Sequence, residues 1–119
     1  MGSGLADLEW LMGWFESRCD GSWEHKECLR LEAIDNPGWW ITIDIAKERV
    51  DASKDTVLAV EGEPPSARNG NVGGPSWMLC QIKAGKFEGA GDSRKLARII
   101  GCFREMVMGE NGAGRGAGG

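Results

Sequence analysis

The residues best suited to proton transfer lie close together between positions 20 and 25. Asp20 and Glu24 supply carboxylates, and His25 supplies the chain's one imidazole. Histidine titrates near neutral pH and carboxylates can tune that titration, so such a group could act in acid–base catalysis. However, the sequence shows no nucleophile or oxyanion donor beside these residues. We therefore assign no catalytic residue and favour a structural interpretation, in which Asp20 caps a turn, Glu24 is solvated and His25 begins a strand. A binding role remains open.

The cysteines are the next candidates for chemistry, as metal ligands or disulfide partners. They are scattered along the chain, at Cys19, Cys28, Cys80 and Cys102, with no C-x-x-C pair and a single histidine to complete a metal set. Zinc sites normally show closer spacing, and disulfides are rare in cytoplasmic proteins. We expect four reduced, mostly buried thiols and no metal site.

A glycine-rich segment near the C-terminus superficially resembles a dinucleotide-binding loop. Residues 89–91 read Gly-Ala-Gly between an expected strand and an expected helix, but Arg94 stands where the third glycine belongs. The chain also ends before another strand could supply the acid that binds a ribose. We therefore expect no cofactor. Arg94, Lys95 and Arg98 could hold an anion at the helix start, although a solvated face is the better interpretation.

The first element that positions these residues is a helix over residues 5–19. Apolar side chains recur there at spacings of three and four, which is typical of one side of a helix. The predicted inward stripe consists of Leu8, Leu11, Met12, Phe15 and Cys19. Trp10 and Trp14 are four residues apart, so we expect them to stack one turn above the other.

A β-hairpin is predicted next. Residues 29–33 alternate as in a half-buried strand, and Asn36-Pro37-Gly38 favours a type II turn, because proline presets its φ and glycine supplies a positive φ. The strand after the turn alternates more clearly. One side carries Trp39, Ile41, Ile43 and Ile45, which we expect in the core, and the other carries Trp40, Thr42 and Asp44.

The second half predicts further strands over 56–61, 77–82 and 86–89. Residues 62–75 hold three of the four prolines and predict a mobile loop. Asp92 or Ser93 can cap a second helix, whose apolar stripe consists of Leu96, Ile99, Ile100, Phe103 and Val107. We expect one domain over 5–108 and a disordered glycine-rich tail over 109–119.

These elements predict an α+β fold: an antiparallel sheet of four to five meandering strands with an N-terminal and a C-terminal helix packed on one face. The other face would then be open. If the isoleucines of the second strand meet the helices, Trp40, Thr42 and Asp44 lie on that open face, joined by Arg30, Glu32 and Trp77. Aromatic and charged patches of this kind are typical of protein interfaces.

Composition narrows the class of partner. The net charge of -4 argues against binding to nucleic acid or to anionic membranes, both of which require clustered Lys and Arg. No apolar run is long enough to cross a bilayer, and the N-terminus lacks the pattern of a secretory signal. We therefore expect a cytoplasmic protein with a basic protein partner, and we leave its oligomeric state open. The six tryptophans, with three Phe and no Tyr, are an unusual distribution of aromatic area.

Several blocks of the sequence together resemble the bacterial immunity protein 53 family. They are residues 8–11, 14–17, 19–25, 35–39, 43–45, 77–82, 86–89 and 96–103, of which Trp-Glu-His and Asp-Asn-Pro-Gly-Trp are the most specific in combination. The resemblance implies a protein that binds a toxin of a polymorphic toxin system and protects the bacterium that makes it, without catalysis. A basic, nuclease-like domain is one class of toxin that would suit an acidic inhibitor. The candidate contact residues are Asp20, Trp23, Glu24, His25, Trp40 and Asp44.

A second hypothesis comes from a different class of function. Asp20, Glu24 and His25 could serve a small enzyme or ligand-binding domain if they converged on a concave, tryptophan-lined pocket. Side chains that diverge over a flat surface would argue against it. A housekeeping adaptor of the same fold is a third possibility, which the sequence does not separate from an immunity protein.

Overall fold

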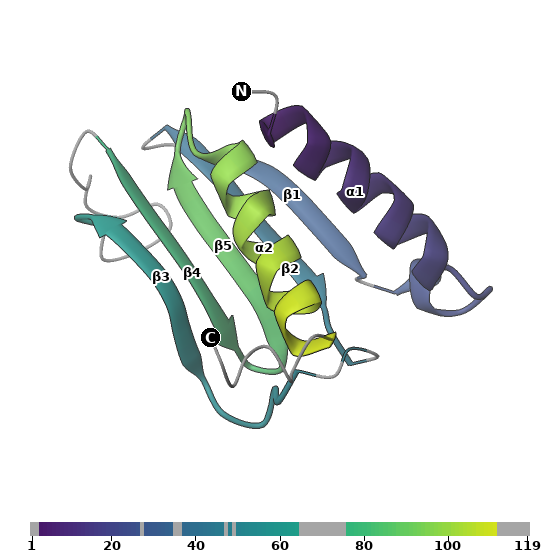
Figure 1. Cartoon of the computed structure of the whole chain (residues 1–119). Coiled ribbons are helices and arrows are strands. Elements are labelled where there is room, and N and C mark those ends of the chain that lie inside the picture. Colours follow the sequence, from purple (N-terminus) through teal and green to yellow (C-terminus); the bar gives the residue numbers. More distant parts are fainter. Residues whose placement is uncertain are drawn as a thin grey trace.

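The structure, a computed structural model, describes residues 3–26, 28–34, 37–46, 48, 50–64 and 76–111. Its elements in chain order are α1 (Ser3–Arg18), the 3-10 turn η1 (Trp23–His25), β1 (Leu29–Ile34), β2 (Gly38–Asp44), β3 (Thr56–Gly62), β4 (Trp77–Lys83), β5 (Lys86–Asp92) and α2 (Leu96–Asn111). The strand pairs of this sheet are antiparallel, and both helices lie over the same face (Figure 1). The predicted α+β class, with its N-terminal and C-terminal helices, is confirmed.

The strand order is β1-β2-β5-β4-β3, so the five strands do not follow one continuous meander. β1 and β2 form a hairpin, and β3, β4 and β5 form a consecutive set, but β2 pairs with β5 rather than with β3. Glycines in β5 allow α2 to pack closely over it, because a Cβ on Gly89 would lie only 2.4 Å from Ile99 Cγ2. The strand with the smallest side chains therefore carries the helix, and β3 is left at an edge of the sheet.

The core lies between the sheet and the two helices. Phe103 of α2 is fully buried, and its ring centroid lies 4.8 Å from that of Trp14 and 5.0 Å from that of Phe87. The isoleucines predicted to face the core are also buried, at Ile41, Ile43 and Ile45. Trp39 shares their side of β2 but is only half-buried, and its indole Nε1 donates to the Ser93 carbonyl oxygen at 3.1 Å. The predicted alternation of β2 is confirmed.

The helix α1 buries a different side from the one predicted. Leu11 is buried, but Leu8 is 42% exposed and Met12 62% exposed. Cys19 lies beyond the end of the helix and is exposed. Apolar residues surround most of α1, so their spacing does not select one side. The orientation is instead decided by the partners that the tryptophans find elsewhere in the fold.

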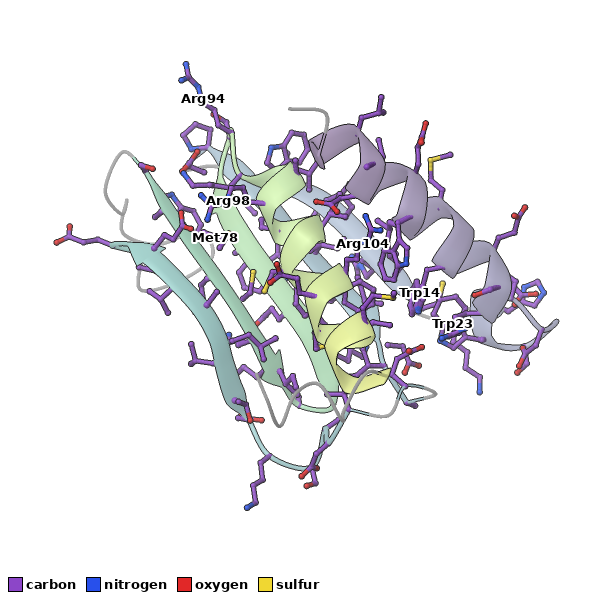
Figure 2. All side chains as sticks on the ribbon, in the orientation of Figure 1. Trp14, Trp23, Met78, Arg94, Arg98 and Arg104 are labelled. Carbon is purple, nitrogen blue, oxygen red and sulfur yellow. The ribbon has the colours of Figure 1, made fainter. Side chains whose placement is uncertain are left out.

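Trp14 is the residue that orients α1. Its ring is 6% exposed and its Nε1 donates to Glu48 Oε2 at 3.2 Å, while Arg18 of the same helix pairs with that carboxylate at 2.5 Å. The predicted stack of Trp10 on Trp14 is confirmed, with centroids 6.4 Å apart and planes at 23°. Arg104 of α2 pairs with Asp7 of α1 at 3.0 Å, and Figure 2 shows it directed toward α1. These contacts join the two helices and seat α1 over the β2 side of the sheet.

The predicted type II turn at Asn36-Pro37-Gly38 is wrong at its glycine, because Gly38 has no positive φ and already begins β2. Ala84 and Gly85 join β4 to β5 with φ angles of 53° and 81°, as a type I′ hairpin turn requires. Asn36 lies outside the described residues, as do 65–75 of the long loop and 112–119 of the tail. The helix α2 runs to Asn111, past the predicted start of the tail at 109. In the described part of the chain, neither helix has the length and apolarity to span a membrane.

Candidate protein interface

The loop between α1 and β1 holds Asp20, Glu24 and His25, whose side-chain types could serve in proton transfer. Glu24 accepts hydrogen bonds from the backbone amides of Asp20 and Gly21, both at 2.8 Å. Asp20 Oδ1 accepts from the amides of Ser22 and Trp23, both at 2.9 Å. The two carboxylates thus fold the loop by bonding to its backbone. Asp20 caps a turn, as predicted. Glu24 is not simply solvated, and His25 ends the η1 turn rather than beginning a strand.

Hydrogen bonding also favours the ionised form of Glu24. Backbone amides, its own first and then those of Asp20 and Gly21, lower the pKa of its carboxyl. An ionised acid that already accepts two amide hydrogens is a poor proton donor. The described hydrogen bonds of Asp20 and Glu24 therefore stabilise the fold of the loop, and Asp20 and His25 remain exposed on it.

Trp23 is placed in the core rather than at the surface. It is 6% exposed, and its ring lies 5.7 Å from Trp14 at 86° and 5.6 Å from Phe15 (Figure 2). This burial leaves the indole little area for a partner, and its selection as a contact residue stays a prediction. Asp20 and His25 on either side of it are exposed.

The cavity described in this structure does not involve the residues of the pocket hypothesis. The structure contains a cavity of about 580 Å³, but it lies between α2, β3 and β4, away from this loop. Its lining residues are Asp7, Leu58, Ala59, Glu61, Met78, Ala97, Arg98, Gly101, Cys102 and Glu105. None of Asp20, Glu24 and His25 lines it. Among the described residues, no group of three His, Cys, Asp or Glu side chains is placed to hold a metal ion.

The second group of predicted contact residues lies on the sheet face that carries neither helix. We call this the helix-free face and define it by the partly or fully exposed side chains of Arg30, Glu32, Trp40, Thr42, Asp44, Gln81, Lys86 and Glu88. They share one face because they alternate with the buried helix-side residues and lie opposite one another in register. The sheet thus brings together residues from four strands.

Antiparallel pairing arranges the helix-free face in rows. Trp40 lies between Glu32 of β1 and Ala90 of β5, and Thr42 lies between Arg30 and Glu88. The latter row continues into β4, where Gln81 Nε2 donates to Glu88 Oε1 at 2.7 Å. Charges of both signs therefore flank the indole of Trp40.

A further row crosses the end of β2. Asp44 faces Lys86 of β5, and its Oδ1 also accepts from the Ala46 amide at 2.8 Å. This hydrogen bond orients the carboxylate at the point where β2 ends. Asp44 is half-buried and Lys86 likewise, so a charged pair of positions closes the end of the helix-free face.

The apolar residues of the helix-free face form a small cluster at its other end. Ile34, Trp77 and Ala90 are buried together, and the half-buried Trp40 packs against them. Trp77 was expected among the accessible residues but is only 2% exposed. The correction has a simple cause: Trp77 begins β4 beside these apolar neighbours, which enclose it. Trp40 is the tryptophan of this face that retains exposed area.

A buried ion pair behind this cluster was not identified from the sequence as a unit. Asp92 is 8% exposed and Lys95 9%. Lys95 Nζ donates to Asp92 Oδ2 and to Ser76 Oγ, both at 2.7 Å, and the Trp77 amide donates to the same Asp92 oxygen at 2.8 Å. Only the spacing of three between the two residues, next to a helix start, could have indicated it. The pair joins the ends of β4 and β5 to α2.

Comparison with known proteins bears directly on this arrangement. No curated protein and no solved structure matches the chain. The family model described as immunity protein 53 matches residues 8–108, which include every strand of the sheet, most of both helices, the η1 loop and the helix-free face. Because the match extends over far more than half of its length, the chain belongs to the immunity protein 53 family.

Proposed function

We propose that this protein binds a bacterial toxin domain stoichiometrically and neutralises it, acting in the cytoplasm without catalysis. Membership of an immunity protein family supports the general role. The single observation that carries the proposed binding site is the arrangement of the sheet. Both helices cover one face (Figure 1), while Trp40 and charged residues from three strands lie on the other.

Trp40 is the proposed anchor of the complex. It is half-buried against Ile34, Trp77 and Ala90, so its ring is already held in place before a partner arrives. A preorganised indole offers a large contact area at low entropic cost, and tryptophans of this kind dominate the energetics of protein interfaces. The charged residues near it, including Glu32 and Asp44, would contribute to specificity, because they favour a partner surface of complementary charge.

The η1 loop is proposed as a second contact region. Asp20 and His25 are exposed, and Glu24 fixes the backbone that presents them. The loop leads directly into β1, and Cys28 at that junction accepts a backbone hydrogen bond from Asp44 at 2.9 Å. The loop therefore lies at the end of the sheet where Asp44 closes the helix-free face. Trp23 supports this region from the core.

The acidic net charge favours a basic partner, such as a nuclease-like toxin domain. A charge of -4 attracts a basic surface over several ångströms, which raises the rate of association and is screened by salt. We therefore expect the association rate with the toxin encoded beside this gene to fall steeply with added salt. The dissociation rate should respond less, because it depends on contacts such as those of Trp40.

The decisive experiment compares variants for binding to that neighbouring toxin domain, inactivated at its own active site. Trp40→Ala should raise the dissociation constant about 30-fold or more, as loss of a hot-spot tryptophan does. Met12→Ala is the matched control, because Met12 is 62% exposed but lies on α1, on the opposite side of the sheet. Coexpression with the active toxin should show the same ranking in cell survival.

Two results would remove the proposal. One is that the wild-type protein neither binds the neighbouring toxin nor rescues cells from it. The other is that Met12→Ala weakens binding as much as Trp40→Ala while both variants unfold at the wild-type denaturant concentration, which would place the interface on the helices.

A further inference from the structure

The edge strand β3 exposes an unusual amount of apolar surface. It pairs with β4 on one side, and no other described strand pairs with its outer side. Val57 is 58% exposed, Val60 53% and Leu58 36%. An outer strand normally carries lysine, proline or inward-pointing charge that discourages pairing. Between Thr56 and Gly62 the one charged residue is Glu61, and it is engaged with Arg98 of α2.

A β-bulge places two exposed valines of β3, Val57 and Val60, on the same face of the sheet. Val57 pairs with Gln81 and Ala59 with Cys80, so Leu58 is the extra residue. Val60 pairs with Leu79. Gln81 and Leu79 are two residues apart on β4, so Val57 and Val60 lie on the same sheet face and have the same hydrogen-bonding geometry. Without the bulge, two residues three apart would lie on opposite faces.

The bulge therefore permits β3 to pair with a copy of itself in a register that sets Val57 opposite Val60. When two copies run antiparallel, Val57 of one can lie opposite Val60 of the other, and the reverse pair follows from the two-fold axis. The same register sets Thr56 opposite Glu61. It also sets Lys54, just before the strand, opposite Glu63, just after it; both are exposed. Apolar side chains thus meet apolar ones, and a cation meets an anion twice.

We propose that two copies of this chain associate through β3, in this register, to form one continuous sheet across a two-fold axis. The axis is perpendicular to the sheet, so the helices of both copies lie on one side and both helix-free faces on the other. Each copy keeps its own Trp40 and η1 loop accessible, because β3 and β1 are at opposite edges of the sheet (Figure 1). The dimer can then hold two toxin domains.

Charge reversal tests both the surface and the register. Lys54→Glu creates two Glu–Glu contacts across the axis, and Glu63→Lys creates two Lys–Lys contacts, so each variant alone should raise the dimer dissociation constant about tenfold. An equimolar mixture of the two variants restores both opposite-charge contacts and should form a heterodimer of near wild-type affinity. Sedimentation velocity over a range of concentrations measures all three.

A second variant tests the apolar centre. Val60→Lys should abolish the dimer, whereas Met108→Lys, which changes an α2 residue of 50% exposure, should leave it unchanged. Circular dichroism and denaturant unfolding confirm that each variant is folded. The proposal is overturned if the wild-type protein sediments as a monomer throughout, or if the mixture of charge variants fails to recover the dimer. It is also overturned if Val60→Lys weakens only toxin binding, since β3 would then pair with the toxin.

Discussion

Replacing Asp92 by asparagine is the most informative test of how the sheet is held to α2. The Asp92 carboxylate accepts from the Trp77 amide at 2.8 Å, from Lys95 Nζ at 2.7 Å and, through its other oxygen, from the Arg94 amide at 2.9 Å. An asparagine keeps the size of the side chain but has one acceptor oxygen. It therefore gives up the ion pair and leaves at least one amide without its acceptor.

Two independent routes give the size of the effect. Burial by itself would raise the pKa of Asp92, but the hydrogen bonds from Lys95 and from the Arg94 and Trp77 amides outweigh it and hold the pKa at about 2, against an ordinary 3.8. At 1.36 kcal/mol per pKa unit this difference corresponds to about 2 kcal/mol. Breaking a buried pair from one side costs about 3–5 kcal/mol, because the remaining charge is left buried. We expect Asp92→Asn to lower the free energy of unfolding by about 3 kcal/mol.

The pH dependence has a definite sign. The folded-state pKa of Asp92 is depressed, so its stabilising contribution is complete above the unfolded value of 3.8 and is lost as pH falls toward about 2. The gap in stability between wild type and variant should therefore be constant near neutral pH and narrow between about pH 4 and pH 2. Urea unfolding followed by tryptophan fluorescence measures it at each pH.

Matched variants show whether the buried pair is responsible. Asp51 also accepts hydrogen bonds, from Ser53, but it is exposed, so Asp51→Asn should change stability little. Lys95→Met removes the other charge, and in the double variant with Asp92→Asn the two losses should be less than additive. Two results would refute this account of the pair. One is a loss of unfolding free energy below about 1 kcal/mol for Asp92→Asn, and the other is a stability difference between wild type and variant that does not change between about pH 4 and pH 2.

Three further predictions follow from individual contacts. Gly89→Ala should destabilise the fold by about 1–3 kcal/mol, because its Cβ would lie 2.4 Å from Ile99 Cγ2, and calorimetry should show a lower melting temperature. Trp23→Ala should lower stability by about 3–5 kcal/mol and weaken toxin binding only in proportion to the unfolded fraction; a folded variant with lost affinity would return Trp23 to the interface. Alkylation of the native protein should modify Cys19 first and spare Cys80, which is fully buried and whose thiol pKa is raised by a hydrogen bond with Cys102 and by burial, as peptide mass mapping would show.

The local structure could be predicted where one side of an element differs clearly from the other. In β2 the isoleucines alternate with polar residues, so Ile41 and Ile43 were placed in the core and Trp40 on the opposite face, as the structure has them. Asp20 could be recognised as a capping residue because its hydrogen bonds reach only two and three residues along the chain. Interactions of such short range are encoded in the sequence next to them.

The buried side of α1 and the positions of two tryptophans required the tertiary structure. Apolar residues surround α1, and what turned Trp14 inward was Phe103 in a helix that begins far along the chain. Trp23 and Trp77 have patterns compatible with exposure, but distant residues enclose them. The burial of a large side chain depends on which distant residues pack against it in the folded chain. The sequence near that side chain does not contain this information.

The sequence by itself determined the class of the fold, the faces of β2 and the family, because alternation, helical spacing and motif blocks are properties of the chain alone. Tertiary structure decided the strand order. β5 lies between β2 and β4, where its glycines admit α2 closely, and this order brings Lys86 and Glu88 beside Asp44 and Thr42. Which strands become neighbours depends on how the helices pack over the whole sheet, so the helix-free face and the exposed edge of β3 exist only once the chain has folded.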